Sequence, residues 1–71
     1  MKEGEVKDIN KKYPLMRFVL GLVGKGEKIT SDSPFYETRL MARQRGFTGR
    51  DKTNPEKRVV SDRGKEFLER K

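Results

Sequence analysis

A single apolar run dominates this otherwise strongly charged sequence. Pro14 suits the first position of a helix, and the apolar residues after it recur at the three- and four-residue spacing that is typical of one. These residues are Leu15, Phe18, Val19, Leu22 and Val23. At roughly 100° per residue the apolar positions cover an arc of roughly 200°, with Arg17 and Gly21 opposite, so we expect this helix at the centre of the core. Gly24 and Gly26 should supply the left-handed conformations that end helices, so the helix should stop near Gly24.

The absence of cysteine and histidine leaves packing as the source of stability. It excludes disulfides, thiolate nucleophiles, imidazole bases and nearly every structural zinc arrangement. A chain of 71 residues buries only about 60% of the surface that its unfolded form exposes, so one compact domain is the most it can build. The acidic residues show no pairing that would set two carboxylates beside an apolar pocket. We therefore predict that the protein is not an enzyme and uses no metal or other cofactor.

The length of the same apolar run indicates whether the chain can cross a membrane. Residues 18–23 fall far short of the roughly 20 apolar residues that span a bilayer. Residues 1–12 are a charged mixture, whereas a secretory signal peptide has a basic start followed by an apolar stretch. The sequence therefore predicts no membrane association and a cytoplasmic location.

A second helix is expected at residues 34–45. Residues 31–33, Ser-Asp-Ser, supply capping side chains, and Pro34 again suits the first helical position. The apolar stripe of this helix comprises Tyr36, Leu40 and, just past the end, Phe47. Gly46 should end the helix, because glycine readily adopts the left-handed conformation found there.

The last third of the chain predicts a hairpin and a short helix. Residues 47–50 and 57–60 are strand-like and are separated by the turn-rich residues 51–56. Ser61 offers a helix cap, and the apolar residues 67–68 supply the packing contact of a terminal helix. An antiparallel two-stranded hairpin followed by a short helix is the simplest arrangement.

The secondary structure of residues 1–12 is less clearly indicated by the sequence. Val6 and Ile9 lie among charged residues and are compatible with a short helix or a strand. We expect residues 1–12 to form a partly ordered N-terminal arm and residues 13–71 to form a single domain. The predicted fold class is α+β and mostly helical, with two to three helices, a C-terminal two-stranded hairpin and a short terminal helix.

Positive charge is concentrated in the middle of the chain. The formal net charge is +7, and within residues 39–58 the cationic side chains face only Asp51 and Glu56 as acids. The cations there are Arg39, Arg43, Arg45, Arg50, Lys52, Lys57 and Arg58. Such a local excess attracts polyanions and raises the rate of encounter with them. The expected partner is a nucleic acid bound largely through its phosphates.

The second half of the chain resembles the winged-helix family of DNA-binding domains. The shared features are a helix that ends in Gly46-Phe47, a basic hairpin around Asn54-Pro55, and a strand that runs into a capped helix at residues 59–68. The resemblance covers residues 34–70 and implies a winged-helix-like domain with a helix-turn-helix core that acts in transcription regulation. The family places two helices between its first helix and the wing, whereas residues 31–46 have room for one full helix.

If the second helix enters a major groove, specific side chains should meet the DNA. Arg45 and Thr38 on its outer face, with Gln44 at the margin, are best placed to reach base edges, since Arg favours guanine and Gln favours adenine. Arg39 and Arg43 lie beside the apolar stripe, and Arg45 points nearly the opposite way. The hairpin cations that should hold phosphates are Arg50, Lys52, Lys57 and Arg58. The expected function is that of a small transcriptional regulator that binds double-stranded DNA. The charge pattern fits RNA as well.

A protein partner is the alternative. A small adaptor or inhibitor would dock on an acidic surface of a larger protein through apolar residues that lie off the core stripes. These are Phe35, Met41, Met16 and Leu20. The segment after the first helix also partly resembles the nucleic-acid clamp of KH domains, which needs two glycines separated by two residues. Counted from Gly24, Glu27 stands at the second position and would repel phosphate.

Overall fold

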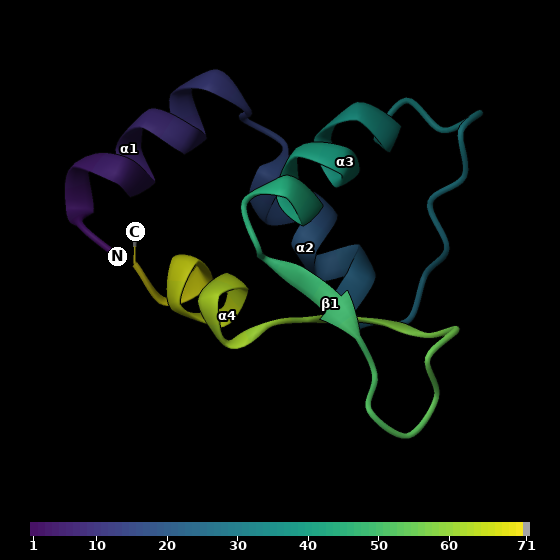
Figure 1. Ribbon diagram of the computed structural model, residues 1–71. Helices are drawn as coiled ribbons and strands as arrows, with labels where there is room; N and C mark the ends of the chain where they lie inside the picture. Colours follow the sequence, from purple (N-terminus) through teal and green to yellow (C-terminus); the bar gives the residue numbers. More distant parts are fainter. Residues whose placement is uncertain (71) are drawn as a thin grey trace.

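The computed structural model describes residues 1–70 and shows an α+β domain (Figure 1). The helices α1 (Glu3–Lys12), α2 (Met16–Gly24) and α3 (Tyr36–Gln44) come first. The antiparallel strands β1 (Thr48–Arg50) and β2 (Arg58–Val60) follow as a hairpin, and α4 (Asp62–Glu69) comes last. The predicted class, mostly helical with a C-terminal hairpin and a short terminal helix, is confirmed. Within residues 1–70 no helix is long and apolar enough to cross a membrane.

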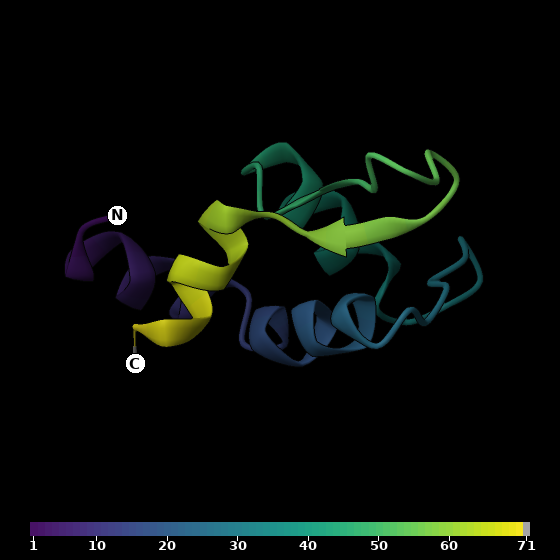
Figure 2. The same cartoon turned by 90° about the horizontal axis from the view of Figure 1, so that it is seen from below.

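Helix α2 lies at the centre of the fold, as its wide apolar arc predicts. It contacts α1, α3 and β2, and in Figure 2 it lies on one side of the molecule with α3 and the hairpin on the other. Its buried side chains are Met16, Val19, Leu20 and Val23. These positions recur at i, i+3, i+4 and i+7, so one helical face provides the contact. Full burial of such a side chain contributes roughly 1.5–3 kcal/mol.

The outward face of α2 differs from the expected one. Gly21 is exposed as predicted, but Arg17 is partly buried and bonded to the end of α4. Leu15 and Phe18 are instead 45% and 53% exposed. The apolar arc is wider than its neighbours can cover, and α4 covers the side that carries Arg17.

The apolar docking patch of the alternative hypothesis is wrong as composed. Two of its residues, Met16 and Leu20, are fully buried in the core. The other two, Phe35 and Met41, are partly buried and pack against the core. An interaction surface that includes Met16 and Leu20 would require the domain to open.

The N-terminal segment, expected as a partly ordered arm, is a helix that belongs to the core. Val6 is fully buried and Ile9 is 5% exposed, and both lie in one cluster with residues of α2, α3 and α4. Three-residue spacing places the two side chains on one face of α1. Acidic residues in its first turn and the basic residues 11–12 in its last turn suit the helix dipole. These local features decide between a helix and a strand only when other helices offer a surface against which Val6 and Ile9 can pack.

Helix α3 begins two residues later than predicted. Residues 31–35 form turns, in which the hydroxyl of Ser33 accepts a hydrogen bond from the backbone N–H of Phe35 at 3.1 Å. Gly46 ends the helix with φ of +77°, as predicted. The apolar stripe is only partly right: Phe47 is fully buried, whereas the buried residue of α3 itself is Ala42. Tyr36 and Leu40 are partly buried.

The hairpin and α4 have the expected form. The strands pair in the register Thr48↔Val60, Gly49↔Val59 and Arg50↔Arg58. Ser61 caps α4 by accepting a hydrogen bond from the backbone N–H of Gly64 at 3.1 Å. The backbone N–H of Ser61 donates to the carbonyl of Phe47 at 2.9 Å, and the rings of Phe47 and Phe67 stack with centroids 4.9 Å apart. The start of α4 is thus fixed to the start of β1.

Gly64→Ala is expected to destabilise the fold strongly. A Cβ atom at this position would lie 2.2 Å from the Phe47 carbonyl oxygen and 2.7 Å from a methyl carbon of Val60, so backbone must move. Overpacking of this kind typically costs about 1–3 kcal/mol or more. Urea unfolding followed by circular dichroism measures the loss. The matched control is Gly21→Ala, where nothing lies within 4 Å and the helix should gain about 0.5–1 kcal/mol. Equal stability of the two variants would contradict the close contact.

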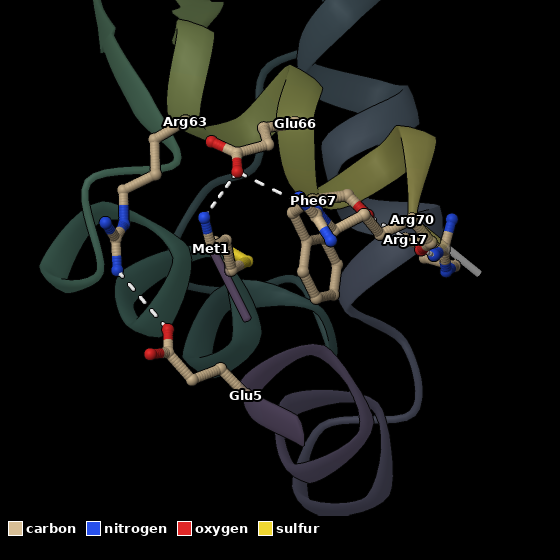
Figure 3. A network of polar contacts seen from close by, with 7 residues as sticks. All are labelled: Met1, Glu5, Arg17, Arg63, Glu66, Phe67 and Arg70. Carbon is tan, nitrogen blue, oxygen red and sulfur yellow. Dashed lines mark hydrogen bonds and ion pairs between the residues drawn. The ribbon is translucent and has the colours of Figure 1, made fainter. Parts of the chain in front are cut away.

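Arg17 ties α2 to the end of α4 (Figure 3). Its guanidinium donates to three carbonyls, those of Phe67 at 3.3 Å, Leu68 at 2.9 Å and Arg70. The last carbonyls of a helix have no partner within the helix, and a cation there also complements the negative end of the helix dipole. A charged residue in the otherwise apolar α2 therefore has a structural role.

A second polar contact joins the first residue to α4. The α-ammonium of Met1 pairs with the Glu66 carboxylate, and Arg63 lies 4.0 Å from the carboxylate of Glu5 in α1 (Figure 3). The hydrogen bond and the charge of the Met1 ammonium lower the pKa of Glu66, with smaller contributions from Arg70 and Arg63. This end of the molecule is held by pairs of opposite charge.

Glu66→Gln is expected to make the fold less sensitive to acid. A carboxyl group whose pKa is lower in the folded than in the unfolded state stabilises the fold above its unfolded pKa, and this contribution is lost as the pH falls through the folded pKa. Urea unfolding at about pH 7 and about pH 3 brackets that window. The unaltered protein should lose more stability on acidification than Glu66→Gln, while Glu69→Gln serves as a control outside the pair. Equal losses for the unaltered protein and Glu66→Gln would refute the assignment.

Candidate nucleic-acid interface

Four arginines converge from α3 and the hairpin. Arg39 and Arg43 are one helical turn apart on α3 and so share a face. Arg50 and Arg58 are directly paired across the two strands. Helix α3 contacts β1, which brings the helical pair toward the strand pair. We call Arg39, Arg43, Arg50 and Arg58 the arginine cluster.

The charges of the other three arginines act on Arg58. Burial lowers the pKa of Arg58, and the charges of Arg43, Arg39 and Arg50 lower it further, in that order. Among residues 1–70 no carboxylate lies within 4.0 Å of a guanidinium nitrogen of the cluster. Like charges without partners repel one another, so this arrangement costs stability that an anionic ligand would return.

The nearest acidic residue of the hairpin has its own partners. Asp51 accepts hydrogen bonds from the backbone N–H of Thr53 at 2.9 Å and from its hydroxyl at 2.8 Å. These bonds are the largest causes of a lowered pKa of Asp51, and the backbone of Asn54 and the charge of Lys57 add to them. Asp51 therefore shapes the hairpin turn instead of neutralising the cluster. Lys52 is exposed in the same turn.

A groove of about 460 Å³ adjoins the cluster. It lies between the loop at residues 26–30, Arg39 of α3, and the hairpin residues 54 and 56–58. Val23 and Ile29 line it and are 4% and 8% exposed. Arg39 and Arg58 thus belong to both the groove and the cluster.

Arg45, expected to read bases, lies apart from the cluster. Its guanidinium is 5.8 Å from the centre of the Tyr13 ring, and it lines a separate hollow of about 650 Å³ together with Glu5 and Asp8 of α1. Arg45 therefore does not line the groove that Arg39 and Arg58 share. Gln44 is exposed and Thr38 is partly buried.

The sequence predicts all four arginines of the cluster as contacts to nucleic acid from the second helix and the hairpin. It does not predict the groove, whose lining includes Lys28, Thr30 and Asn54. Nothing in the sequence pattern places the loop at residues 26–30 beside the hairpin. Only the tertiary contacts bring these segments together.

The fold and this face define a small α+β domain with a local, unpaired basic surface. Comparison of the chain with models of protein families, with curated protein sequences and with solved structures gives no match. The residues that the structure describes contain no group of three or more His, Cys, Asp or Glu side chains that could hold a metal ion. The chemistry of the arginine cluster is therefore the basis for a functional proposal.

Arg43→Gln is expected to stabilise the fold at low salt. The change removes one charge from the cluster, and Gln resembles Arg in helix propensity. Relief of repulsion between exposed charges should contribute about 0.2–0.5 kcal/mol at about 0.01 M salt and nearly nothing at about 1 M. Urea unfolding at both salt concentrations measures this difference. Arg45→Gln, which lies outside the cluster, is the control and should give no gain; a loss of stability for Arg43→Gln at low salt would mean that Arg43 has a favourable partner.

Proposed function

We propose that this protein binds nucleic acid through the arginine cluster, as a small DNA-binding regulator that contacts the phosphates of double-stranded DNA. The observation that carries the proposal is the pairing of Arg50 with Arg58 across the hairpin that packs against α3, the helix of Arg39 and Arg43, with no carboxylate within 4.0 Å of these guanidinium groups among residues 1–70. Planar guanidinium groups match phosphate oxygens in a bidentate geometry. A regulator of this kind acts in the cytoplasm.

The order of elements supports a winged-helix arrangement. Counted from α1, two helices, α2 and α3, lie between the first helix and the hairpin, which is the number that the resemblance requires. The hairpin then takes the place of the wing, with Arg50 and Arg58 at its base. On this proposal α3 and the hairpin face the duplex together, and Lys52 and Lys57 add charge toward the hairpin tip.

The cluster implies a mode of recognition. Contacts to phosphates position a protein on DNA, whereas contacts to base edges specify sequence. The side chain best suited to read guanine, Arg45, lies at the Tyr13 ring on the side of α1. We therefore propose that affinity arises mainly from the backbone and that sequence discrimination is low.

A protein partner with an acidic surface is the second candidate. The observation that favours it is the exposed apolar pair of Leu15, which directly precedes α2, and Phe18 of α2, with the Phe18 ring 5.2 Å from that of Phe35. Chemical-shift mapping with a short duplex separates the two candidates. Shifts concentrated at residues 38–58 support nucleic acid, and weak, diffuse shifts support the protein partner.

Binding to a random duplex should weaken steeply with salt. Four phosphate contacts give a slope of log K against log salt of about −3.6, which corresponds to a loss of roughly 100-fold between about 50 and about 200 mM. Fluorescence anisotropy with a labelled duplex measures the slope. The double variant Arg43→Gln, Arg50→Gln should bind more weakly and reduce the slope by about 2.

The control for this experiment removes the same charge elsewhere. The double variant Lys7→Gln, Lys11→Gln changes exposed residues of α1 and should leave the slope nearly unchanged. Equal effects of the two double variants would mean that net charge, and not the cluster, binds DNA. An affinity that stays constant as salt rises would remove the electrostatic basis altogether.

A further inference from the structure

The groove beside the arginine cluster combines an apolar floor with a cationic rim. Val23 and Ile29 form the floor, and both belong to an apolar cluster with Val19. The cations on the rim are Lys28, Arg39, Lys57 and Arg58. A volume of about 460 Å³ is typical of sites for small molecules, which pair apolar walls with a few polar groups that fix orientation.

We propose that this groove binds a small organic phosphate, with an apolar ring on Val23 and Ile29 and the phosphate held by Arg39 and Arg58, and that this ligand displaces nucleic acid from the protein. The displacement rests on the proposed function, whereas the binding site does not. Arg39 and Arg58 come from α3 and β2 and flank the same hollow, so their two planar forks can meet one phosphate group from two directions.

The charge of the groove suits one phosphate group. Glu27 and Glu56 also line it, so two carboxylates oppose the four rim cations and leave an excess of two positive charges. This excess matches a phosphate monoester, which carries nearly two negative charges at neutral pH. The carboxylates can accept hydrogen bonds from hydroxyl groups of the ligand.

The apolar floor distinguishes this ligand from the backbone of a duplex. A duplex presents phosphates and sugars outward and keeps its bases stacked, so it offers no flat apolar group to Val23 and Ile29. Inorganic phosphate has no such group either. A ring joined to a phosphate is the simplest chemistry that satisfies both the floor and the rim.

The shared arginines make the two ligands competitors. When a phosphate group occupies Arg39 and Arg58, half of the arginine cluster is neutralised and the path of the duplex backbone is obstructed. By linkage, the organic phosphate weakens the binding of DNA by the same factor by which DNA weakens the binding of the organic phosphate. The groove would thus regulate the nucleic-acid surface directly, without a conformational change.

Binding of phenyl phosphate to the whole protein tests the site without DNA. The methyl signals of Val23 and Ile29 in NMR spectra should shift and saturate, with an affinity at least tenfold higher than that of inorganic phosphate. Phenol alone, which has the ring without the charge, should bind at least tenfold more weakly than phenyl phosphate. Equal affinities for phenyl phosphate and inorganic phosphate, or unmoved methyl signals, would overturn the site.

Two variants locate the ligand within the molecule. Thr30 is exposed and lines the groove, so Thr30→Phe should fill the hollow and weaken phenyl phosphate at least tenfold while the fold is kept. Lys52→Gln removes a hairpin cation that does not line the groove and should change the affinity less than twofold. If Thr30→Phe binds phenyl phosphate as tightly as the unaltered protein does, the proposed location is wrong.

Competition with a labelled duplex at constant ionic strength tests the regulation. Phenyl phosphate should raise the apparent Kd for the duplex in the unaltered protein and have no effect in Thr30→Phe, which retains the arginine cluster. No change in the unaltered protein would overturn the regulatory step. If phenyl phosphate binds but the duplex does not, the proposed function is refuted and the groove site stands. If the duplex binds but phenyl phosphate does not, the groove site is refuted and the proposed function stands.

Discussion

The close contact between the start of α4 and the start of β1 sets the geometry of the whole C-terminal half. Gly64 leaves no room for a side chain against the Phe47 carbonyl, and the Ser61 backbone N–H donates to that same carbonyl at 2.9 Å. The hydroxyl of Ser61 also donates to the carbonyl of Gly46. The end of α3 and both ends of the hairpin therefore meet at one junction. Because this junction fixes the hairpin against α3, arginines that are distant in sequence emerge on the same face.

Within residues 1–70 the arginine cluster has no ion pair, partly because acidic residues have partners elsewhere. Glu66 pairs with the Met1 ammonium and Glu5 with Arg63, at the end of the molecule where α1 meets α4. Asp51 is bonded to Thr53 within the hairpin turn. Opposite charges thus hold the ends of the fold together, while like charges accumulate across α3 and the hairpin. A domain of this size has only a few kcal/mol of stability in reserve, so the apolar core must offset the repulsion.

The sequence predicts those features of the fold that depend on neighbouring residues. Helix α2 ends at Gly24 as expected, although the left-handed residue after it is Gly26 and not Gly24. Gly46 and the Ser61 cap mark the other two helix ends through local backbone conformation and a local hydrogen bond. The hairpin likewise follows from two strand-like runs around a turn. The features that were missed depend on distant partners: α1 becomes part of the core through α2 and α4, and Arg17 is partly buried because α4 ends beside it.

The same distinction separates the predicted from the missed parts of the candidate site. Composition and position identify each arginine of the cluster as a cation near the hairpin, but helical projection of α3 alone cannot place Arg39 and Arg43 relative to Arg50 and Arg58. The cross-strand register and the junction at Phe47 supply that information. The groove depends further on the loop at residues 26–30, where Gly26 has φ of +83° and redirects the chain after α2.

The sharing of two arginines limits how strongly the groove can control the basic face. An organic phosphate held by Arg39 and Arg58 leaves Arg43 and Arg50 available to a polyanion, so the competition weakens binding instead of abolishing it. A ligand can shift such an equilibrium only by its differential affinity for the free and DNA-bound protein. Because each phosphate contact adds to the salt dependence of DNA binding, the loss of two contacts reduces the affinity for DNA most at low ionic strength, and the competition is therefore strongest there.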